Sequence, residues 1–152
     1  MLEISFSNET SARVSPSAVK KIVLQTGRFE KKIKGEVEIT MVGEKKIISL
    51  NSKYRGKNKV TDVLSFSLIE GGNDSPPFQG GVRGGLPSIL LGQIFICYPQ
   101  IVRQAKEYGV TVEEEFARML AHGLLHLVGY DHVKPSDAKK MFRLQEKIVK
   151  LS

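Results

Sequence analysis

The sequence predicts an α/β (α+β) domain built on a mixed sheet of four or five strands with helices packed against it. Two observations support this class. Segments with alternating or continuous apolar residues, typical of strands, fill the first two thirds of the chain, and segments with apolar residues at helical spacing precede and follow them. The 152 residues suffice for one domain, so we treat residues 1–152 as a single unit.

The N-terminal part is expected to form a strand and then a helix. The apolar residues of Leu2–Phe6 predict an outer strand of the sheet. Ser15 and Pro16 fit the N-cap and the first position of a helix. Apolar residues then recur at helical spacing until Thr26-Gly27, where we expect the helix to end.

A β-hairpin is predicted next. Apolar and polar residues alternate over Glu36–Val42, and Gly43-Glu44 offers a two-residue turn into a second strand over Lys45–Leu50. Thr61–Leu68 and Leu90–Tyr98 are further predicted strands, because both are rich in large apolar residues and are bounded by turn-forming residues.

The connection Gly71–Pro87 is rich in glycine and proline and has almost no apolar residues. Such a segment cannot contribute to a core. A structureless loop of this length is usually a lid, a linker or a disordered insertion. We therefore expect a flexible insertion at 71–87.

The C-terminal third is predicted to be helical. Thr111 and Glu114 have the spacing of a capping box, which starts a helix over Val112–Val128. Most faces of this helix are apolar, so it is expected to be buried across the sheet. A last helix is expected over Pro135–Val149, with an inward apolar stripe and an outward basic face.

The three histidines of the chain, His122, His126 and His132, fall within eleven residues. The first two are four residues apart on one helix face, so both imidazoles can reach one cation. Gly129 can end the helix and turn the chain so that His132 approaches the same point. The pattern H-x-x-x-H-x-x-G-x-x-H has the spacing of the metzincin zinc site.

One position departs from the metzincin pattern. Gly123 stands where those peptidases have their catalytic glutamate, which disfavours a protease. Three histidines leave an open position at the metal, as in catalytic rather than structural zinc sites. One Zn²⁺ per chain is expected, although three imidazoles also suit nickel, copper or cobalt. Asp131 fits either a carboxylate that orients a ligand imidazole or a cap of the turn.

Composition restricts the compartment and the partners. The net charge of +7 and the pI of about 9.5 favour polyanions such as RNA or ribosomes as partners, or simply a solvated basic surface. The single cysteine, Cys97, excludes an internal disulfide and a cysteine-based zinc site, and a buried apolar role is expected for it. The longest apolar stretches are too short to cross a membrane, and a cytoplasmic location is expected.

Two segments carry a family resemblance. The stretch from His122 to His132, HGLLHLVGYDH, resembles the signature H-G-x-L-H-L-x-G-Y-D-H of the YbeY family of bacterial endoribonucleases and rRNA maturation factors. The stretch from Leu50 to Phe66 resembles the family's L-N-x-x-Y-R-G-x-x-x-x-T-D-V-L-S-F. The chain departs from the family at Gln93, where an acid is usual.

The resemblance implies a zinc-dependent, single-strand-specific endoribonuclease, a hydrolase of RNA phosphodiester bonds. It also implies a role in 16S rRNA 3′-end maturation and ribosome quality control, with the small ribosomal subunit as partner. His122, His126 and His132 are then the metal ligands, and Arg55 matches the family's functionally important arginine. A guanidinium can bind phosphate oxygens bidentately, but a structural arginine, paired with a carboxylate or packed over the strand, is the alternative.

Two other functions stay open. One is a ribosome-associated assembly factor with a mainly structural metal, for which replacing His126 would harm folding as much as activity. The other is a metal-dependent hydrolase of a different substrate, which Gly123 and the net charge of +7 disfavour. The sequence does not define the oligomeric state, the cleavage position or the attacking group, which is either zinc hydroxide or the RNA 2′-hydroxyl.

Overall fold

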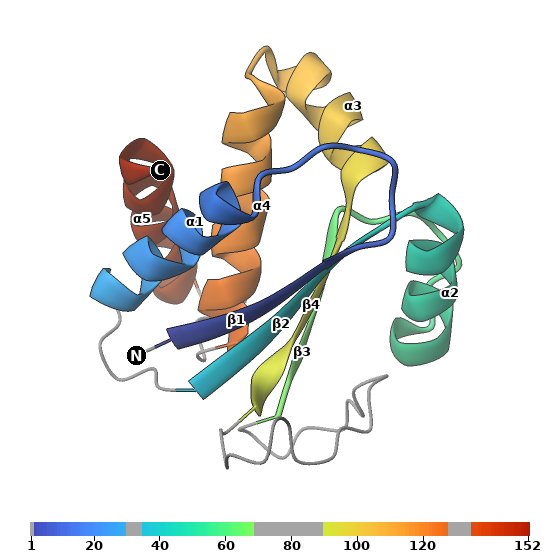
Figure 1. Cartoon of the computed structure of the whole chain (residues 1–152), viewed down its shortest axis with the longest axis horizontal. Helices are drawn as coiled ribbons and strands as arrows, with labels where there is room; N and C mark the ends of the chain where they lie inside the picture. Colours follow the sequence, from blue (N-terminus) through green and yellow to red (C-terminus); the bar gives the residue numbers. More distant parts are fainter. Residues whose placement is uncertain (1, 30–34, 69–89, 128–134) are drawn as a thin grey trace.

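A four-stranded mixed sheet organises the computed structural model, which describes residues 2–29, 35–68, 90–127 and 135–152 (Figure 1). The elements follow one another as β1 (Leu2–Asn8), α1 (Pro16–Phe29), β2 (Gly35–Val42), α2 (Glu44–Arg55), β3 (Val63–Ser67), β4 (Leu90–Cys97), α3 (Tyr98–Tyr108), α4 (Val112–Leu127) and α5 (Pro135–Leu151). The predicted α/β class with a mixed sheet is confirmed.

The strand order is β1-β2-β4-β3, with β1, β2 and β4 parallel and β3 antiparallel to β4. The predicted outer strand is therefore confirmed as β1, at one edge. At the other edge lies β3, which among the described strands pairs with β4 alone. The two predicted strands in this region, Thr61–Leu68 and Leu90–Tyr98, correspond to β3 and β4 with slightly shorter bounds.

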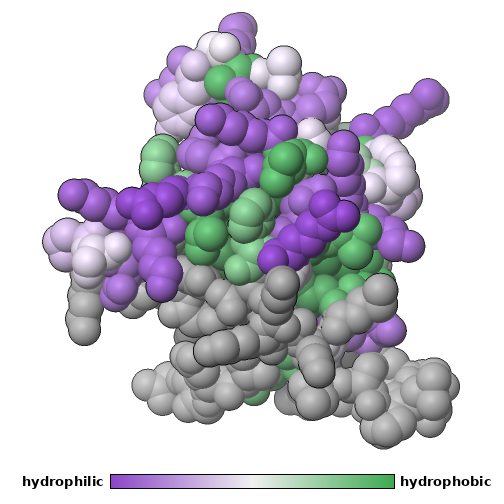
Figure 2. Space-filling view, turned by 90° about the vertical axis from the view of Figure 1, so that its left-hand side faces the viewer, coloured by the Kyte–Doolittle hydropathy of each residue, from purple (hydrophilic) through white to green (hydrophobic). Residues whose placement is uncertain are grey.

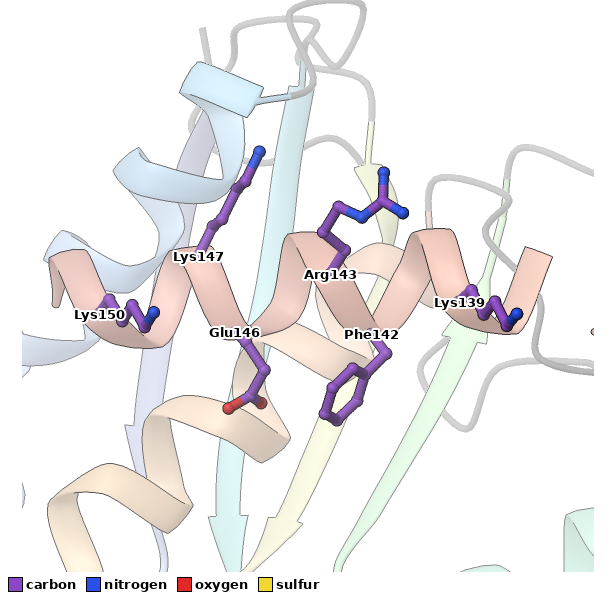
Figure 3. Close-up of a pocket in the computed structure, with 6 residues that line it drawn as sticks. All are labelled: Lys139, Phe142, Arg143, Glu146, Lys147 and Lys150. Atoms are coloured by element: carbon purple, nitrogen blue, oxygen red, sulfur yellow. The ribbon is translucent and has the colours of Figure 1, made fainter. Parts of the chain in front are cut away.

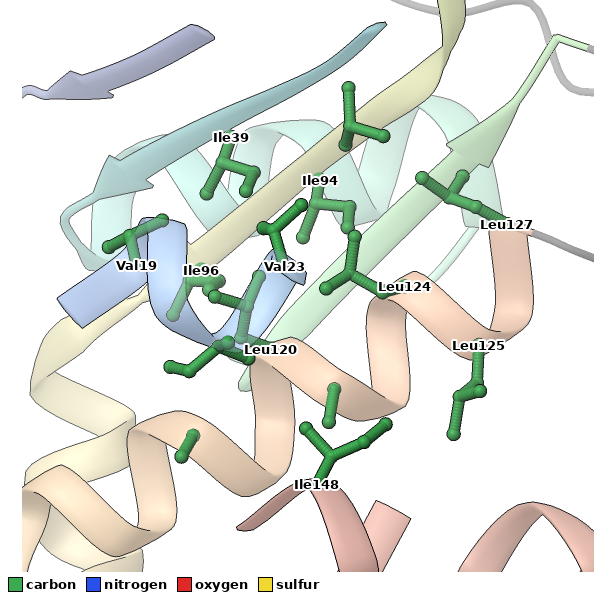
Figure 4. Close-up of a cluster of buried hydrophobic side chains, with 14 of the residues drawn as sticks. Val19, Val23, Ile39, Ile94, Ile96, Leu120, Leu124, Leu125, Leu127 and Ile148 are labelled. Carbon is green, nitrogen blue, oxygen red and sulfur yellow. The ribbon is translucent and has the colours of Figure 1, made fainter. Parts of the chain in front are cut away.

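Helices α1 and α4 cover one face of the sheet, α5 packs against both of them, and α2 covers part of the opposite face (Figure 1). The larger core lies between the sheet and α4, where Leu124 points toward Ile94 of β4 (Figure 4) and Leu120 is fully buried. Burial of each such side chain contributes roughly 1.5–3 kcal/mol to stability. Helix α4 is thus fixed along most of its length, as its apolar pattern predicted.

The predicted hairpin is wrong in its second half, because residues 45–50 belong to α2. Strand β2 already pairs with β1 on one side and β4 on the other, so no edge is left for a hairpin partner. The apolar residues Ile47 and Leu50 are three apart and both face a smaller core beneath α2, a spacing that suits a helix. The strand prediction for Glu36–Val42 is confirmed as β2.

The predicted helices are confirmed, and two further helices, α2 and α3, were not predicted. Helix α4 begins as the capping box requires, with the backbone N–H of Glu114 donating to the Thr111 hydroxyl at 3.1 Å. It is described as far as Leu127. Besides α2, the unpredicted helix is α3, which starts directly after β4 and buries Ile101 and Ala105. The predicted insertion 71–87 lies outside the described residues.

Cys97 is fully buried at the end of β4, as expected for a small apolar side chain. Loss of solvent around the thiol raises its pKa, so the neutral form is favoured. Every helix within the described ranges is too short or too polar to span a lipid bilayer.

Candidate metal centre and arginine

The imidazoles of His122 and His126 lie together on one face of α4. Their Nε2 atoms are 3.1 Å apart, and the ring centroids are separated by 4.6 Å with the planes at 81°. Both side chains are half-buried. The predicted pairing of these two histidines on one helix face is therefore present in the structure.

The separation of the two Nε2 atoms fits a shared metal ion. Two nitrogen ligands at zinc distances of about 2.0–2.1 Å in a tetrahedral arrangement lie roughly 3.3 Å from each other. The observed 3.1 Å is close to this value. Neutral imidazole is also a preferred donor for zinc and other late transition metals. The donor set that the structure describes thus fits the metal suggested by the sequence.

The third predicted ligand, His132, lies outside the described residues, as do Gly129 and Asp131. Within the described ranges, no group of three His, Cys, Asp or Glu side chains is placed to hold a metal ion. A three-histidine site therefore remains a prediction, of which His122 and His126 form the part that the structure describes.

Gly123 brings α4 close to the sheet. A Cβ atom at this position would lie 3.0 Å from the Ser65 hydroxyl oxygen and 3.3 Å from methyl carbons of Val63 and Ile94. The glutamate that metzincins carry here would point into this packed contact, where its charge would be buried. The structure therefore gives a physical reason why a peptidase glutamate does not fit this helix.

Arg55 is the last residue of α2, and the end of that helix is well defined. Gly56 adopts a left-handed conformation with φ of 69°, and its backbone N–H bonds the carbonyl of Ser52. The buried Asn51 side chain donates to the Lys59 carbonyl at 3.0 Å. These contacts fix the turn after α2 and with it the direction in which Arg55 leaves the helix.

The Arg55 side chain reaches the edge strand β3. Its Nη2 donates to the Ser65 carbonyl at 2.7 Å, and its guanidinium lies 5.0 Å from the centre of the Phe66 ring. The hydroxyl of Ser65 in turn donates to the Gly123 carbonyl at 3.2 Å. Ser65 therefore links Arg55 to the turn of α4 that lies between the two histidines.

The residues around Arg55 have mixed roles. Lys53, Lys57 and Lys59 are exposed, as a surface that contacts a phosphate backbone requires. Tyr54 packs edge-on against Phe66, with the ring centroids 5.4 Å apart, and so has a packing role. On the same face of the sheet, the buried Gln93 donates to a carboxylate oxygen of Glu38 at 2.7 Å. An acid at position 93 would face this carboxylate.

Sequence reasoning missed a polar group on α5 that contacts the histidine pair. The Oε1 atom of Gln145 lies 2.9 Å from Nδ1 of His122. Gln145 stands between Met141 and Ile148 on the inward stripe of α5. The sequence did offer one signal for Gln145, namely a polar residue within the otherwise apolar stripe of α5. It did not show which residue of α4 this glutamine would contact.

The fold and the site together define an α/β protein whose central buried helix carries two histidines suited to a metal. This class agrees with the comparisons. The endoribonuclease YbeY family model matches residues 3–152, and the chain belongs to that family.

Individual relatives are similar over most of the chain. Endoribonuclease YbeY of Halalkalibacterium halodurans is 37% identical over 143 residues, which cover 93% of this chain and 88% of the relative. Endoribonuclease YbeY of Lacticaseibacillus casei is 39% identical over 132 residues, covering 86% and 83%. The solution structure of TM1509 from Thermotoga maritima has a TM-score of 0.61 at 28% identity, and covers 99% of this chain and 88% of that one.

Proposed function

We propose that this protein is a zinc-dependent endoribonuclease that cuts single-stranded RNA. The observation that carries the proposal is the 3.1 Å separation of the His122 and His126 Nε2 atoms, in a chain that belongs to the endoribonuclease YbeY family. His132 is proposed as the third ligand. Zinc in such a site supplies Lewis acidity, because it withdraws electron density from a phosphoryl oxygen and eases the loss of a proton from water.

The chain's own residues orient the RNA. Arg55 is proposed to bind the scissile phosphate, since a guanidinium can offer two parallel N–H donors to phosphate oxygens and stabilise charge that develops there. It bonds the carbonyl of Ser65, whose hydroxyl bonds the turn of α4 that carries the histidines. The exposed Lys53, Lys57 and Lys59 are proposed to contact neighbouring phosphates.

A second basic surface supports binding to a polyanion. Figure 2 shows that the face formed by α1 and α5 is largely hydrophilic. On α5, a surface pocket of about 450 Å³ is lined by four basic side chains, the exposed aromatic ring of Phe142 and Glu146 (Figure 3). The basic residues are Lys139, Arg143, Lys147 and Lys150. Cations beside an aromatic ring suit single-stranded RNA.

This basic surface also favours the second candidate, a ribosome-associated assembly factor in which the metal is mainly structural. For the enzyme, we propose the cytoplasm as location, the small ribosomal subunit as partner, and 16S rRNA 3′-end maturation and ribosome quality control as roles. These roles follow from the family resemblance.

The direct test offers the enzyme three substrates and compares their cleavage. The substrates are an end-labelled single-stranded RNA, the same RNA in a duplex, and an unrelated denatured protein. The proposal expects cleavage of the single strand alone by the wild type, and loss of cleavage in Arg55→Ala and His126→Ala. Cleavage that survives in both variants would mark the activity as a contaminant. Tight RNA binding without cleavage by a zinc-loaded wild type would favour the assembly factor.

A further inference from the structure

Gln145 is one of the few buried polar side chains in the described residues, with 6% of its surface exposed. It projects from α5 toward α4, where its Oε1 atom lies 2.9 Å from His122 Nδ1. The His122 Nε2 atom, at the other side of the ring, faces His126. The glutamine therefore contacts the ring nitrogen that does not point toward the proposed metal position.

The neighbouring carboxylate determines which end of the amide meets His122. The Nε2 atom of Gln145 lies 3.3 Å from Oε2 of Glu146. An ionised carboxylate can only accept hydrogen bonds, so the amide NH₂ group must face Glu146 and the amide oxygen must face His122. The His122 Nδ1 atom then carries the hydrogen. In a neutral imidazole, this leaves the Nε2 lone pair available to a metal.

Helix α4 holds that carboxylate in place. Arg118 donates to both oxygens of Glu146, at 2.9 and 3.1 Å, and this pairing lowers the pKa of Glu146. Arg118 also bonds the buried Glu115 at 3.1 Å. Figure 3 shows Glu146 leaving α5 on the side of α4. A rotated Gln145 amide would direct its NH₂ group at His122 and its oxygen at the Glu146 carboxylate, so this arrangement disfavours the rotation.

We propose that Gln145 is a positioning residue: its amide oxygen holds His122 in the Nδ1–H tautomer and directs the Nε2 lone pair toward a transition metal. The inference rests on the proposed metal site and adds a residue on a different helix to it. Hydrogen-bond partners of ligand histidines typically contribute 10- to 100-fold to metal affinity. We expect a loss of that size when the acceptor is removed.

The test measures zinc affinity of the metal-free full chain by competition with a chromophoric chelator. Gln145→Leu removes the acceptor and is expected to bind zinc about 10- to 100-fold more weakly. Gln145→Glu retains an acceptor oxygen for His122 but directs its other oxygen at the Glu146 carboxylate, so it is expected to weaken zinc binding less than Gln145→Leu does. Ile148→Val, on the same helix face, is the control: it removes one buried methyl group and keeps both polar partners of the Gln145–His122 contact, so zinc affinity is expected to be unchanged.

Histidine ring ¹⁵N NMR of the metal-free protein, at a pH where the imidazoles are neutral, gives a second readout that does not need a loaded enzyme. We expect the Nδ1–H tautomer of His122 in the wild type and a shift toward Nε2–H in Gln145→Leu. Wild-type zinc affinity in Gln145→Leu, equal losses in Gln145→Leu and Gln145→Glu, or an Nε2–H tautomer in the wild type would each overturn the inference. A wild type that binds no zinc would instead overturn the proposed function and the inference with it.

Discussion

The Arg55 Nη2 atom donates a 2.7 Å hydrogen bond to the backbone carbonyl of Ser65, on β3, an edge strand of the described sheet. A cation at the end of a helix is thereby held at the edge of the sheet. The same serine bonds Gly123 through its hydroxyl, so one residue connects the arginine with the histidine helix. This relationship connects Arg55 to the helix that carries the proposed metal ligands.

Arg55→Ala is expected to lower the rate of RNA cleavage by about 10²–10³-fold. This is the usual effect of removing one hydrogen-bond donor that is already placed where negative charge develops in the transition state. Arg55→Lys should recover only part of this, because lysine keeps the charge but loses the planar pair of donors. Single-turnover cleavage of a single-stranded RNA measures both. Lys57→Ala, an exposed neighbour, serves as the control, and equal losses in Arg55→Ala and Lys57→Ala would show that Arg55 contributes only general charge.

Gly92→Ala is expected to destabilise the fold by about 3 kcal/mol, because overpacked cores force backbone shifts. The added Cβ would lie 2.4 Å from the Phe66 carbonyl oxygen and 2.6 Å from Leu127 Cδ2. Gly27→Ala is the matched control, since its Cβ would meet only Leu2 Cδ1 at 3.6 Å inside helix α1. There we expect a gain of up to about 1 kcal/mol from helix propensity. Urea unfolding distinguishes the two, and similar free energies for both variants would contradict the described approach of α4 to β4.

The pairing of Glu146 with Arg118 predicts a dependence of stability on pH. Arg118 lowers the pKa of Glu146 from its ordinary value of 4.5, so the folded state binds this proton more weakly than the unfolded chain. The contribution to the free energy of unfolding is therefore complete above about pH 4.5 and is lost as the pH falls through the lower pKa of the folded state.

Glu146→Gln removes this contribution and is expected to cost about 1 kcal/mol at pH 7, since the pair is partly exposed. Between pH 5 and pH 3, the wild type should lose more stability than the variant. Urea titrations at each pH provide the comparison. Parallel curves for the two proteins would mean that the ion pair does not form in solution.

The sequence predicted the elements whose patterns are local. The capping box at Thr111 and the proline at position 16 mark helix starts that the structure confirms. The error at Lys45–Leu50 arose because a two-residue turn was possible after β2, while the pairing of β2 on both edges is a long-range property. A local pattern does not show which strands will flank another.

The same distinction holds for the site. The four-residue spacing of His122 and His126 is local, and the structure places their Nε2 atoms together. The contact of Gln145 with His122 joins residues 23 positions apart and depends on how α5 crosses α4. The contact of Arg55 with Ser65 depends on the helix α2 that the sequence did not predict.

Zinc is expected to stabilise the wild type by about 2.7 kcal/mol at a free concentration one hundred times its dissociation constant, because it binds only the folded state. His126→Ala should show little of this effect, since one of the facing Nε2 donors is gone. Urea unfolding with and without zinc measures the difference. Equal stabilisation of wild type and His126→Ala would place the metal elsewhere in the molecule.

The central claim is that one metal ion held by the histidines is required for RNA cleavage. The most direct measurement combines elemental mass spectrometry of the purified protein with cleavage of one single-stranded RNA by the wild type, the chelator-treated protein, the same protein with zinc restored, and His126→Ala. The account predicts about one zinc per chain, cleavage lost on chelation and recovered with zinc, and none in His126→Ala. Full cleavage by protein from which the metal has been removed would contradict it.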